Sequence, residues 1–411
     1  MGVTDLIDRL NATVGTLPSL EESERRQLLQ ACDKLKNQLE TPFDIAARLV
    51  FSGHQAMALR LGVDLKLFDA IAAKVGRPDG SIKTDELAEQ TGAEPLLIMR
   101  IMRFLAAMSV VKEVCPGSFT SKPLAAALVS SSPLSAALIH GTHFMTVLSN
   151  LPEYFHTKGW KSPSDAFDGP FQFAIDSPHY FEFLGSTPYY QQAFNTTMAM
   201  SFRRHGKDWF EFFPVAHRLH VSSDAEPLLV DIGGGQGEDL KKFKAQFPTL
   251  PGKLFLQDLP AVVQGAQDLP AGIEVQSHDF FQMQPVKNAK VYFMRTVLHD
   301  WPDKQAVQIL DRVHHAMDTD SILLISETML PESDVLLSSV LSDMQMMGSF
   351  ASLERTEMQW RSLFEQAGLE LVKTWLPDEC DGSSKSLAEQ PALFETRKVL
   401  KNLTICVDRP I

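Results

Sequence analysis

Residues 231–237 read Asp-Ile-Gly-Gly-Gly-Gln-Gly, and this stretch decides the fold class. It continues an apolar run, 228–232, that is typical of a buried parallel strand. After it, Leu240, Phe243 and Phe247 recur at helical spacing. The glycines therefore occupy a strand-to-helix turn, where glycine permits a positive φ and exposed N–H groups can bind a polar ligand. The pattern predicts a turn that binds a nucleotide-type cofactor.

The spacing of these glycines differs from the dinucleotide-binding fingerprint, which has glycine at the first, third and sixth positions. Counted from Gly233, the sixth position is Glu238, because the last glycine comes one residue early. Asp231 stands before the turn, where a carboxylate would oppose a pyrophosphate but suit a cationic ligand. Asp258 ends a second apolar strand and is placed to bind a ribose diol. The combination favours S-adenosylmethionine (SAM) as cofactor; an unrelated glycine-rich turn is the alternative.

Length and charge bound the class of protein. The chain has 411 residues, enough for two or three domains, and its apolar (44%) and charged (22%) contents are ordinary for a soluble protein. A formal charge of −13 argues against a nucleic-acid partner. No apolar run reaches the roughly 18 residues of a membrane span. The four cysteines, at 32, 115, 380 and 406, lack disulfide or metal spacing, so we expect free thiols and a cytoplasmic location without a membrane partner.

Residues 1–125 are predicted to form a mostly helical winged-helix domain. A helix, a turn, a second helix opened by Pro95 and a hairpin at 110–119 follow one another. The same order occurs in DNA-binding regulators, which is the remote alternative. The second helix, however, is apolar around Arg100 and Arg103, whereas a recognition helix presents polar groups to base edges. We favour a packing or dimerisation role for it.

The remaining chain divides at about residue 225. Residues 126–225 are helical and rich in aromatic residues, and are expected to form a linker that lines the substrate site. In 226–411 short strands alternate with helices, which is typical of a doubly wound, Rossmann-like α/β fold. The proposed strands are 228–232, 254–257, 273–276, 290–295, 321–326 and 369–375. Near the C-terminus only Ala392-Leu393-Phe394 suggests another strand, and the pattern leaves open whether it closes the sheet.

Two chemically active side chains follow neighbouring strands. His299 comes just after the strand 290–295, and Glu327 comes at the end of the strand 321–326. The carboxyl ends of parallel strands meet at one edge of the sheet, where ligands bind. A lone histidine in such a place is more often structural than catalytic, but a histidine with an acid from the next strand indicates a possible base and its partner.

Several motifs resemble, in order and spacing, the plant caffeic-acid-type and fungal SAM-dependent O-methyltransferases, over nearly the whole chain. The motifs are 229–237, Gln257-Asp258-Leu259-Pro260, His278-Asp279-Phe280, Phe293-Met294-Arg295, Leu298-His299-Asp300-Trp301, Glu327 and Leu353-Glu354-Arg355-Thr356-Glu357. Those enzymes also carry an N-terminal winged-helix dimerisation domain, so the resemblance implies a homodimer. It implies His299 as general base, with Glu327 and Glu354 flanking the imidazole to orient and polarise it.

The resemblance also implies the residues that hold the cofactor. They are Gly233, Gly234, Gly235, Asp258 at the ribose, Asp279 and Phe280 on the adenine side, and Arg295. Each has a structural alternative: Asp279 as a turn residue, Phe280 as a core residue and Arg295 as one half of an ion pair. No metal is expected, since no ligand spacing would supply one.

The chemistry suits these residue types. An imidazole with a pKa near ~6.5 can accept a proton from a phenol with a pKa near ~10 when the two are aligned and the phenolate develops during the transfer. A carboxylate on the other ring nitrogen stabilises the imidazolium that forms. The expected reaction is methyl transfer from SAM to a hydroxyl of a small aromatic or polyketide-type secondary metabolite. The alternative on the same scaffold is an enzyme that binds SAM but catalyses a dehydration or a pericyclic rearrangement.

Overall fold

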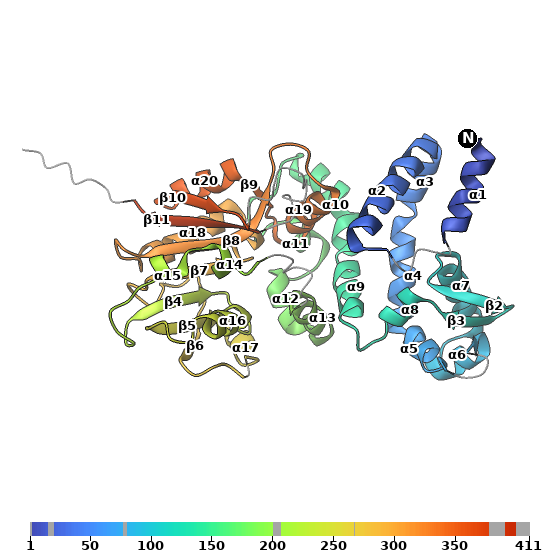
Figure 1. Ribbon diagram of the computed structural model, residues 1–411, viewed down its shortest axis with the longest axis horizontal. Coiled ribbons are helices and arrows are strands. Elements are labelled where there is room, and N and C mark those ends of the chain that lie inside the picture. Colours follow the sequence, from blue (N-terminus) through green and yellow to red (C-terminus); the bar gives the residue numbers. More distant parts are fainter. Residues whose placement is uncertain are drawn as a thin grey trace, which may run out of the picture. The chain divides into compact units, whose positions relative to one another are not determined.

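The computed structural model describes residues 2–14, 20–76, 80–199, 207–266, 268–377 and 391–399. The chain divides into two units, Met1–Ser130 and Ser131–Ile411 (Figure 1). The further division predicted at about residue 225 stays a prediction.

The first unit contains the predicted helix-turn-helix and hairpin. Its helices are α1 (Val3–Val14), α2 (Glu22–Leu39), α3 (Pro42–Val50), α4 (Ser52–Asp64), α5 (Leu67–Ala72), α6 (Thr84–Thr91), α7 (Pro95–Ala107) and α8 (Pro123–Ala127). Its strands are β1 (Ile82–Lys83), β2 (Val111–Cys115) and β3 (Ser118–Ser121). They form an antiparallel sheet in the order β1-β3-β2, so the wing expected at 110–119 is confirmed.

Helix α7 has two different apolar sides. One side is buried within the unit and carries Ile98, Ile101, Met102 and Leu105. Other apolar side chains of the helix, Leu96, Leu97 and Phe104, are exposed in the single chain. The sequence indicated a helix that is apolar around Arg100 and Arg103, and within this unit one of its sides is buried.

The second unit begins with helices that precede the large sheet. They are α9 (Pro133–His143), α10 (Met145–Lys158), α11 (Pro170–Ala174), α12 (Tyr180–Ser186), α13 (Pro188–Ala199), α14 (Trp209–Phe212) and α15 (Val215–Arg218). A cluster of buried side chains joins several of them to α19 (Leu337–Phe350): Phe144, Val147, Phe171, Tyr180, Leu184, Met346 and Phe350.

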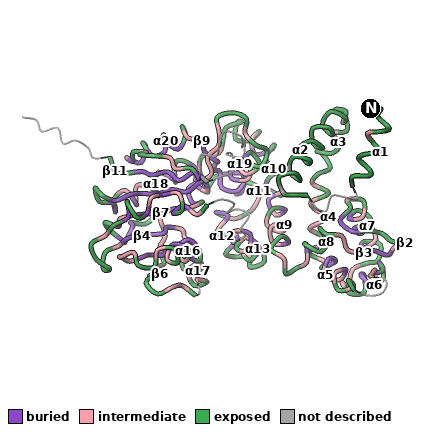
Figure 2. The backbone as a smooth tube through the Cα atoms, viewed as in Figure 1, coloured by how far each residue is buried: buried purple, intermediate pink, exposed green. Residues whose placement is uncertain are grey.

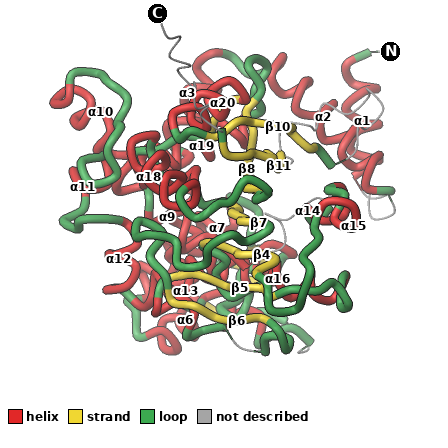
Figure 3. Tube along the Cα trace, turned by 90° about the vertical axis from the view of Figure 1, so that its left-hand side faces the viewer, coloured by secondary structure: helices red, strands yellow, loops and turns green. Residues whose placement is uncertain are grey.

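The sheet of this unit has the order β10-β11-β8-β7-β4-β5-β6, with β9 paired to β8 (Figure 3). Its strands are β4 (Pro227–Ile232), β5 (Lys253–Asp258), β6 (Ile273–Ser277), β7 (Val291–Arg295), β8 (Ile322–Leu330), β9 (Arg355–Thr356), β10 (Leu369–Trp375) and β11 (Pro391–Lys398). The other elements are α16 (Glu238–Gln246), α17 (Pro260–Val263), the 3₁₀ helix η3 (Leu298–Asp300), α18 (Asp303–His314) and α20 (Glu357–Gln366). All six predicted strands are present.

Helices cover both faces of the sheet, as expected for a doubly wound fold. Side chains alternate across each strand, so Val230 and Tyr292 pack on one face, with α18 and α20. Leu229 and Phe293 pack on the other, with α14, α15 and α16. Buried residues therefore follow the strands of this sheet (Figure 2).

The position of β11 answers whether residues 392–394 join the sheet, which the sequence pattern left open. It lies antiparallel between β8 and β10, with Phe394 opposite both Ile325 and Thr374. The apolar residues Ala392, Leu393 and Phe394 are fully buried there. Strand β11 therefore completes the sheet, and β10, the strand predicted at 369–375, is its edge.

Of the cysteines, Cys32 and Cys115 are free and exposed, while Cys380 and Cys406 lie outside the described residues. None of the helices within the described ranges has the length and apolar character needed to span a membrane.

Candidate active site

The glycine turn after β4 packs closely against its surroundings on one side and is open on the other. A Cβ atom on Gly234 would lie 2.6 Å from Cδ1 of Leu256, and one on Gly233 would lie 2.8 Å from Cγ2 of Val297. Gly235 has a φ of +61°, and a Cβ there would meet no atom within 4 Å. The turn thus contacts the loop that carries Val297, and its main chain at Gly235 faces open space.

Asp258, at the end of β5, is fastened to the same turn. The N–H of Gly235 donates to its Oδ2 at 2.8 Å, and the N–H of Leu259 donates to its Oδ1 at 2.7 Å. Burial raises the pKa of the Asp258 carboxyl, and these two N–H groups oppose that rise. A carboxylate has about four lone pairs, so both oxygens can still accept a further hydroxyl. The arrangement fits a ribose diol.

The structure brings Asp279 and Phe280 to the neighbourhood of Asp258. The N–H of His278 donates to the main-chain oxygen of Asp258 at 2.9 Å. Asp279 accepts the N–H of Phe281 at 3.0 Å, which is the turn role considered from the sequence. Phe280 is partly buried and its ring lies edge-on to Trp301, with centroids 5.9 Å apart.

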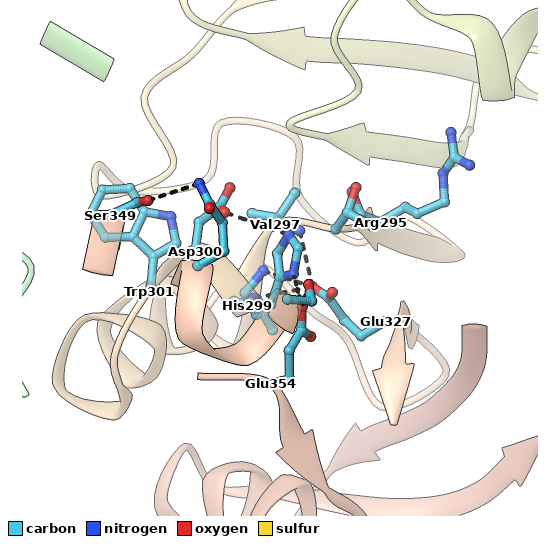
Figure 4. A network of polar contacts seen from close by, with 12 residues as sticks. Arg295, Val297, His299, Asp300, Trp301, Glu327, Ser349 and Glu354 are labelled. Carbon is cyan, nitrogen blue, oxygen red and sulfur yellow. Dashed lines mark hydrogen bonds and ion pairs between the residues drawn. The ribbon is translucent and has the colours of Figure 1, made fainter. Parts of the chain in front are cut away.

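Arg295 forms an ion pair with Asp239, in the first turn of α16. Arg295 is the last residue of β7, directly before the loop that carries His299. Its guanidinium nevertheless points away from His299 (Figure 4). The structure therefore places Arg295 against the helix that follows the glycine turn and not within the cluster around the histidine.

A sharp turn at Thr296 directs the chain from β7 into η3. Thr296 has a φ of +50°, a conformation that is strained for a β-branched residue. Its N–H donates to the main-chain oxygen of Ser326 at 3.1 Å, in the middle of the neighbouring strand β8. This pairing brings the His299 loop beside Glu327.

Glu327 binds the main chain of the His299 loop. Its side chain is fully buried, and Oε1 accepts the N–H groups of Val297 (2.9 Å), Leu298 (2.8 Å) and His299 (3.4 Å). Burial raises the pKa of Glu327 to about 7, although the nearby His299 opposes that rise. The sequence implied a contact with the imidazole, whereas the bonds of Glu327 are to the first turn of η3.

The imidazole of His299 lies between two other carboxylates. Its Nδ1 is 3.2 Å from Oε1 of Glu354 and its Nε2 is 3.5 Å from Oδ1 of Asp300 (Figure 4). Burial favours the neutral ring, but the charges of Asp300, Glu327 and Glu354 outweigh it and raise the pKa of His299 to about 10. The histidine is therefore a stronger base than in water.

Two groups that position Glu354 were not singled out from the sequence. The hydroxyl of Ser342, on α19, donates to Oε1 of Glu354 at 2.7 Å. Oδ1 of Asp343, the next residue, accepts the N–H of Glu354 at 2.9 Å. No sequence signal marks either residue, because their contact with Glu354 depends on how α19 packs.

Arg355 holds the other end of the His299 loop and was also missed. Its guanidinium is buried and donates to the main-chain oxygens of Leu298 (3.0 Å) and Trp301 (2.8 Å). It also pairs with Asp303 at 2.8 Å. A signal existed, because Arg355 stands within the motif 353–357 and an arginine in a core segment requires acceptors.

Aromatic residues from the middle of the chain pack directly on this loop. The ring of His179 stacks on Trp301, with centroids 4.9 Å apart and planes at 1°. Burial lowers the pKa of His179 to about 4, so its ring is neutral at physiological pH. Next to it, the hydroxyl of Tyr180 lies 3.3 Å from Nδ1 of His140.

These features define a class of protein: an α/β Rossmann-like methyltransferase domain that follows an N-terminal winged-helix domain. Family models agree with it. An O-methyltransferase domain matches residues 170–370, and an O-methyltransferase dimerisation domain matches residues 47–131. Demethylsterigmatocystin 6-O-methyltransferase of Aspergillus flavus is 32% identical over 356 residues, which are 86% of this chain and 90% of that protein. The chain belongs to the O-methyltransferase family.

Solved structures of similar shape include proteins with other chemistry. A structure described as a pericyclic reaction enzyme has a TM-score of 0.79 and 29% identity, and covers 96% of this chain and 100% of its own. The structure of LepI in complex with SAM has a TM-score of 0.79 and 28% identity. The match covers 97% of this chain and 100% of the LepI chain.

Proposed function

We propose that this protein transfers a methyl group from SAM to a hydroxyl of a small aromatic or polyketide-type secondary metabolite, with His299 as general base. The observation that carries the proposal is the position of the His299 ring. Glu354 contacts one of its nitrogens, and its loop touches the glycine turn through Val297 and Gly233. This contact supports a single site for the base and the cofactor.

The residues at the glycine turn fit the cofactor. When bound, SAM supplies an electrophilic methyl group. Asp258 would accept the ribose hydroxyls, the open main chain at Gly235 would lie against the ligand, and Asp279 with Phe280 would flank the adenine. Arg295 would act on this part of the site through Asp239 and α16.

The contact of His299 with Glu354 (3.2 Å) is shorter than its contact with Asp300 (3.5 Å), which supports one proton arrangement for the proposed base. In the neutral ring, Nδ1 carries the hydrogen and donates it to Glu354, which leaves Nε2 as the acceptor for the proton of the substrate hydroxyl. The conjugate acid, with its pKa raised to about 10, is then close in acidity to a phenol, whose pKa is near ~10. Proton transfer between them is nearly balanced.

The neighbours of the His299 loop favour a flat, apolar acceptor. The aromatic rings of His179, Tyr180 and Phe350 pack together beside Trp301. These rings are themselves almost fully buried, so they make the surroundings of the loop apolar and rigid rather than contacting the acceptor directly. The O-methyltransferase relative from Aspergillus flavus is named for demethylsterigmatocystin, which supports a metabolite of this general kind.

We propose that the protein is a homodimer. The dimerisation model matches the segment that contains α7, and the exposed Leu96, Leu97 and Phe104 of this helix offer an apolar surface to a second copy. Such a surface would not recognise base edges in DNA.

A second candidate function is a dehydration or pericyclic rearrangement with SAM bound but not consumed, favoured by the similarity to the pericyclic reaction enzyme. One experiment separates the two. The protein is incubated with methyl-labelled SAM and a panel of phenols, and products are analysed by mass spectrometry. Methyl transfer adds one methyl group and yields S-adenosylhomocysteine in equal amount. A rearranged or dehydrated product with SAM intact would favour the second candidate.

A further inference from the structure

Two buried glutamines, Gln257 and Gln284, form a reciprocal amide pair in the second unit. Nε2 of Gln257 donates to Oε1 of Gln284 at 2.9 Å, and Nε2 of Gln284 donates to Oε1 of Gln257 at 2.8 Å. Gln257 also donates to Oε1 of Gln276, its partner across β5 and β6, at 2.9 Å. Both paired side chains are almost fully buried, where an amide is costly unless it is hydrogen-bonded.

The main chain of Gln257 holds the glycine turn. Its carbonyl oxygen accepts the N–H of Gly233 at 2.8 Å and the N–H of Gly234 at 3.2 Å. The next residue is Asp258, whose carboxylate accepts the N–H of Gly235. Any displacement of Gln257 therefore moves both the turn and the acid expected at the ribose.

The side chain of Gln284 holds a segment without regular secondary structure. Residues 278–290 connect β6 to β7 and contain neither helix nor strand, yet they carry Asp279 and Phe280. Oε1 of Gln284 accepts the N–H of Val286 at 3.1 Å as well as the Gln257 amide. Main-chain bonds hold both ends of this segment, at His278 and Lys290, and the Gln284 side chain ties its middle to β5.

We propose that Gln257 and Gln284 are positioning residues for the nucleoside half of the cofactor. This inference rests on the proposed function, because it concerns the same cofactor site. The pair fixes the separation between the glycine turn with Asp258 on one side and Asp279 with Phe280 on the other. A site must hold its contacts within about 0.5 Å to keep its affinity. The pair would supply that precision without touching the ligand.

The test uses Gln257→Met, Gln284→Met and the double variant. Methionine is close in size to glutamine and apolar, so each single variant breaks both reciprocal bonds. The amide that remains keeps only its outer partner, which is Gln276 for Gln257 and Val286 for Gln284, whereas the double variant removes both amides. Tyr292→Phe is the matched control. The Tyr292 hydroxyl contacts the carbonyl oxygens of Val286 (2.8 Å) and Ala316 (3.0 Å) and accepts the N–H of Ala289 (3.2 Å), so it holds the part of the segment that leads into β7. Affinities for S-adenosylhomocysteine and 5′-methylthioadenosine are measured by calorimetry, beside Tm.

We expect each single variant to bind both ligands about tenfold more weakly, the equivalent of one hydrogen bond. The factor should be equal for the two ligands, because 5′-methylthioadenosine lacks only the amino-acid half. The double variant should regain Tm but not affinity, and Tyr292→Phe should lose Tm but not affinity. If affinity and Tm fall and recover together in all four variants, the positioning role is overturned. Failure of the wild-type protein to bind either ligand would instead overturn the proposed function.

Discussion

Nδ1 of His299 and Oε1 of Glu354 are 3.2 Å apart, in side chains that are only 8% and 2% exposed. Little solvent screens this contact, so the charge of Glu354 acts strongly on the ring. Together with Asp300 and Glu327 it keeps the protonated form of His299 stable. The imidazole of His299 is therefore mostly protonated near neutral pH.

The first prediction concerns the pH dependence of turnover. Only neutral His299 can accept a proton, and its pKa is raised to about 10, so kcat/KM should rise as the pH is raised from 7 toward 10. Glu354→Gln removes one of the charges that raise this pKa, so the rising limb should move to lower pH. The charge-matched control is Glu357→Gln, which removes an exposed carboxylate paired with Arg361 and should leave the limb in place. Coincident profiles for all three proteins would show that Glu354 does not tune the base.

The second prediction separates ligand contact from backbone strain at Gly235. Alanine at a positive φ costs roughly 1–2 kcal/mol of stability. Gly272→Ala is the matched control. Gly272 also has a positive φ (+92°), and a Cβ there would also meet no atom, but it precedes β6, whereas the cofactor turn follows the C-terminal end of β4. Urea unfolding should show similar losses for both variants. Calorimetry should show weaker S-adenosylhomocysteine binding for Gly235→Ala alone; equal binding by both would place the ligand elsewhere.

The third prediction concerns Glu327 as the acceptor for the start of η3. Glu327→Ala leaves the buried N–H groups of Val297 and Leu298 without an acceptor, at about 1–3 kcal/mol each, so the free energy of unfolding should fall by several kcal/mol. Glu327→Gln keeps an acceptor oxygen and should lose much less. Denaturant unfolding measures both, and the turnover should fall in the same order. Equal stability of the two variants would mean that the N–H bonds do not carry the effect.

Much of the fold could be predicted from the sequence, because its strands are apolar runs bounded by turn residues. The turn 231–237 lies where it was expected, directly after β4, and the strand predicted at 321–326 is present but continues to Leu330. The place of β11 could not be predicted, since strand order depends on long-range pairing. Phe394 pairs with both β8 and β10, and no local pattern encodes that choice.

The site was predictable where a motif names the residue and unpredictable where the contact depends on the path of the backbone. The pairing of His299 with Glu354 agrees with the resemblance. The bonds of Glu327 to main-chain N–H groups follow from the positive φ at Thr296, which turns η3 toward β8. Sequence patterns do not indicate that turn, because a β-branched residue rarely adopts it.

The proposed function depends on one role, in which His299 takes the proton from the acceptor while other residues hold the cofactor. Its most direct test is His299→Ala, with S-adenosylhomocysteine affinity measured by calorimetry and methyl transfer measured in a single turnover with a phenol that the wild-type protein methylates. We expect an affinity close to wild type and a rate lowered by about 10²- to 10⁴-fold, the usual contribution of a general base. A variant that binds the ligand normally and still transfers the methyl group at the wild-type rate would contradict the account.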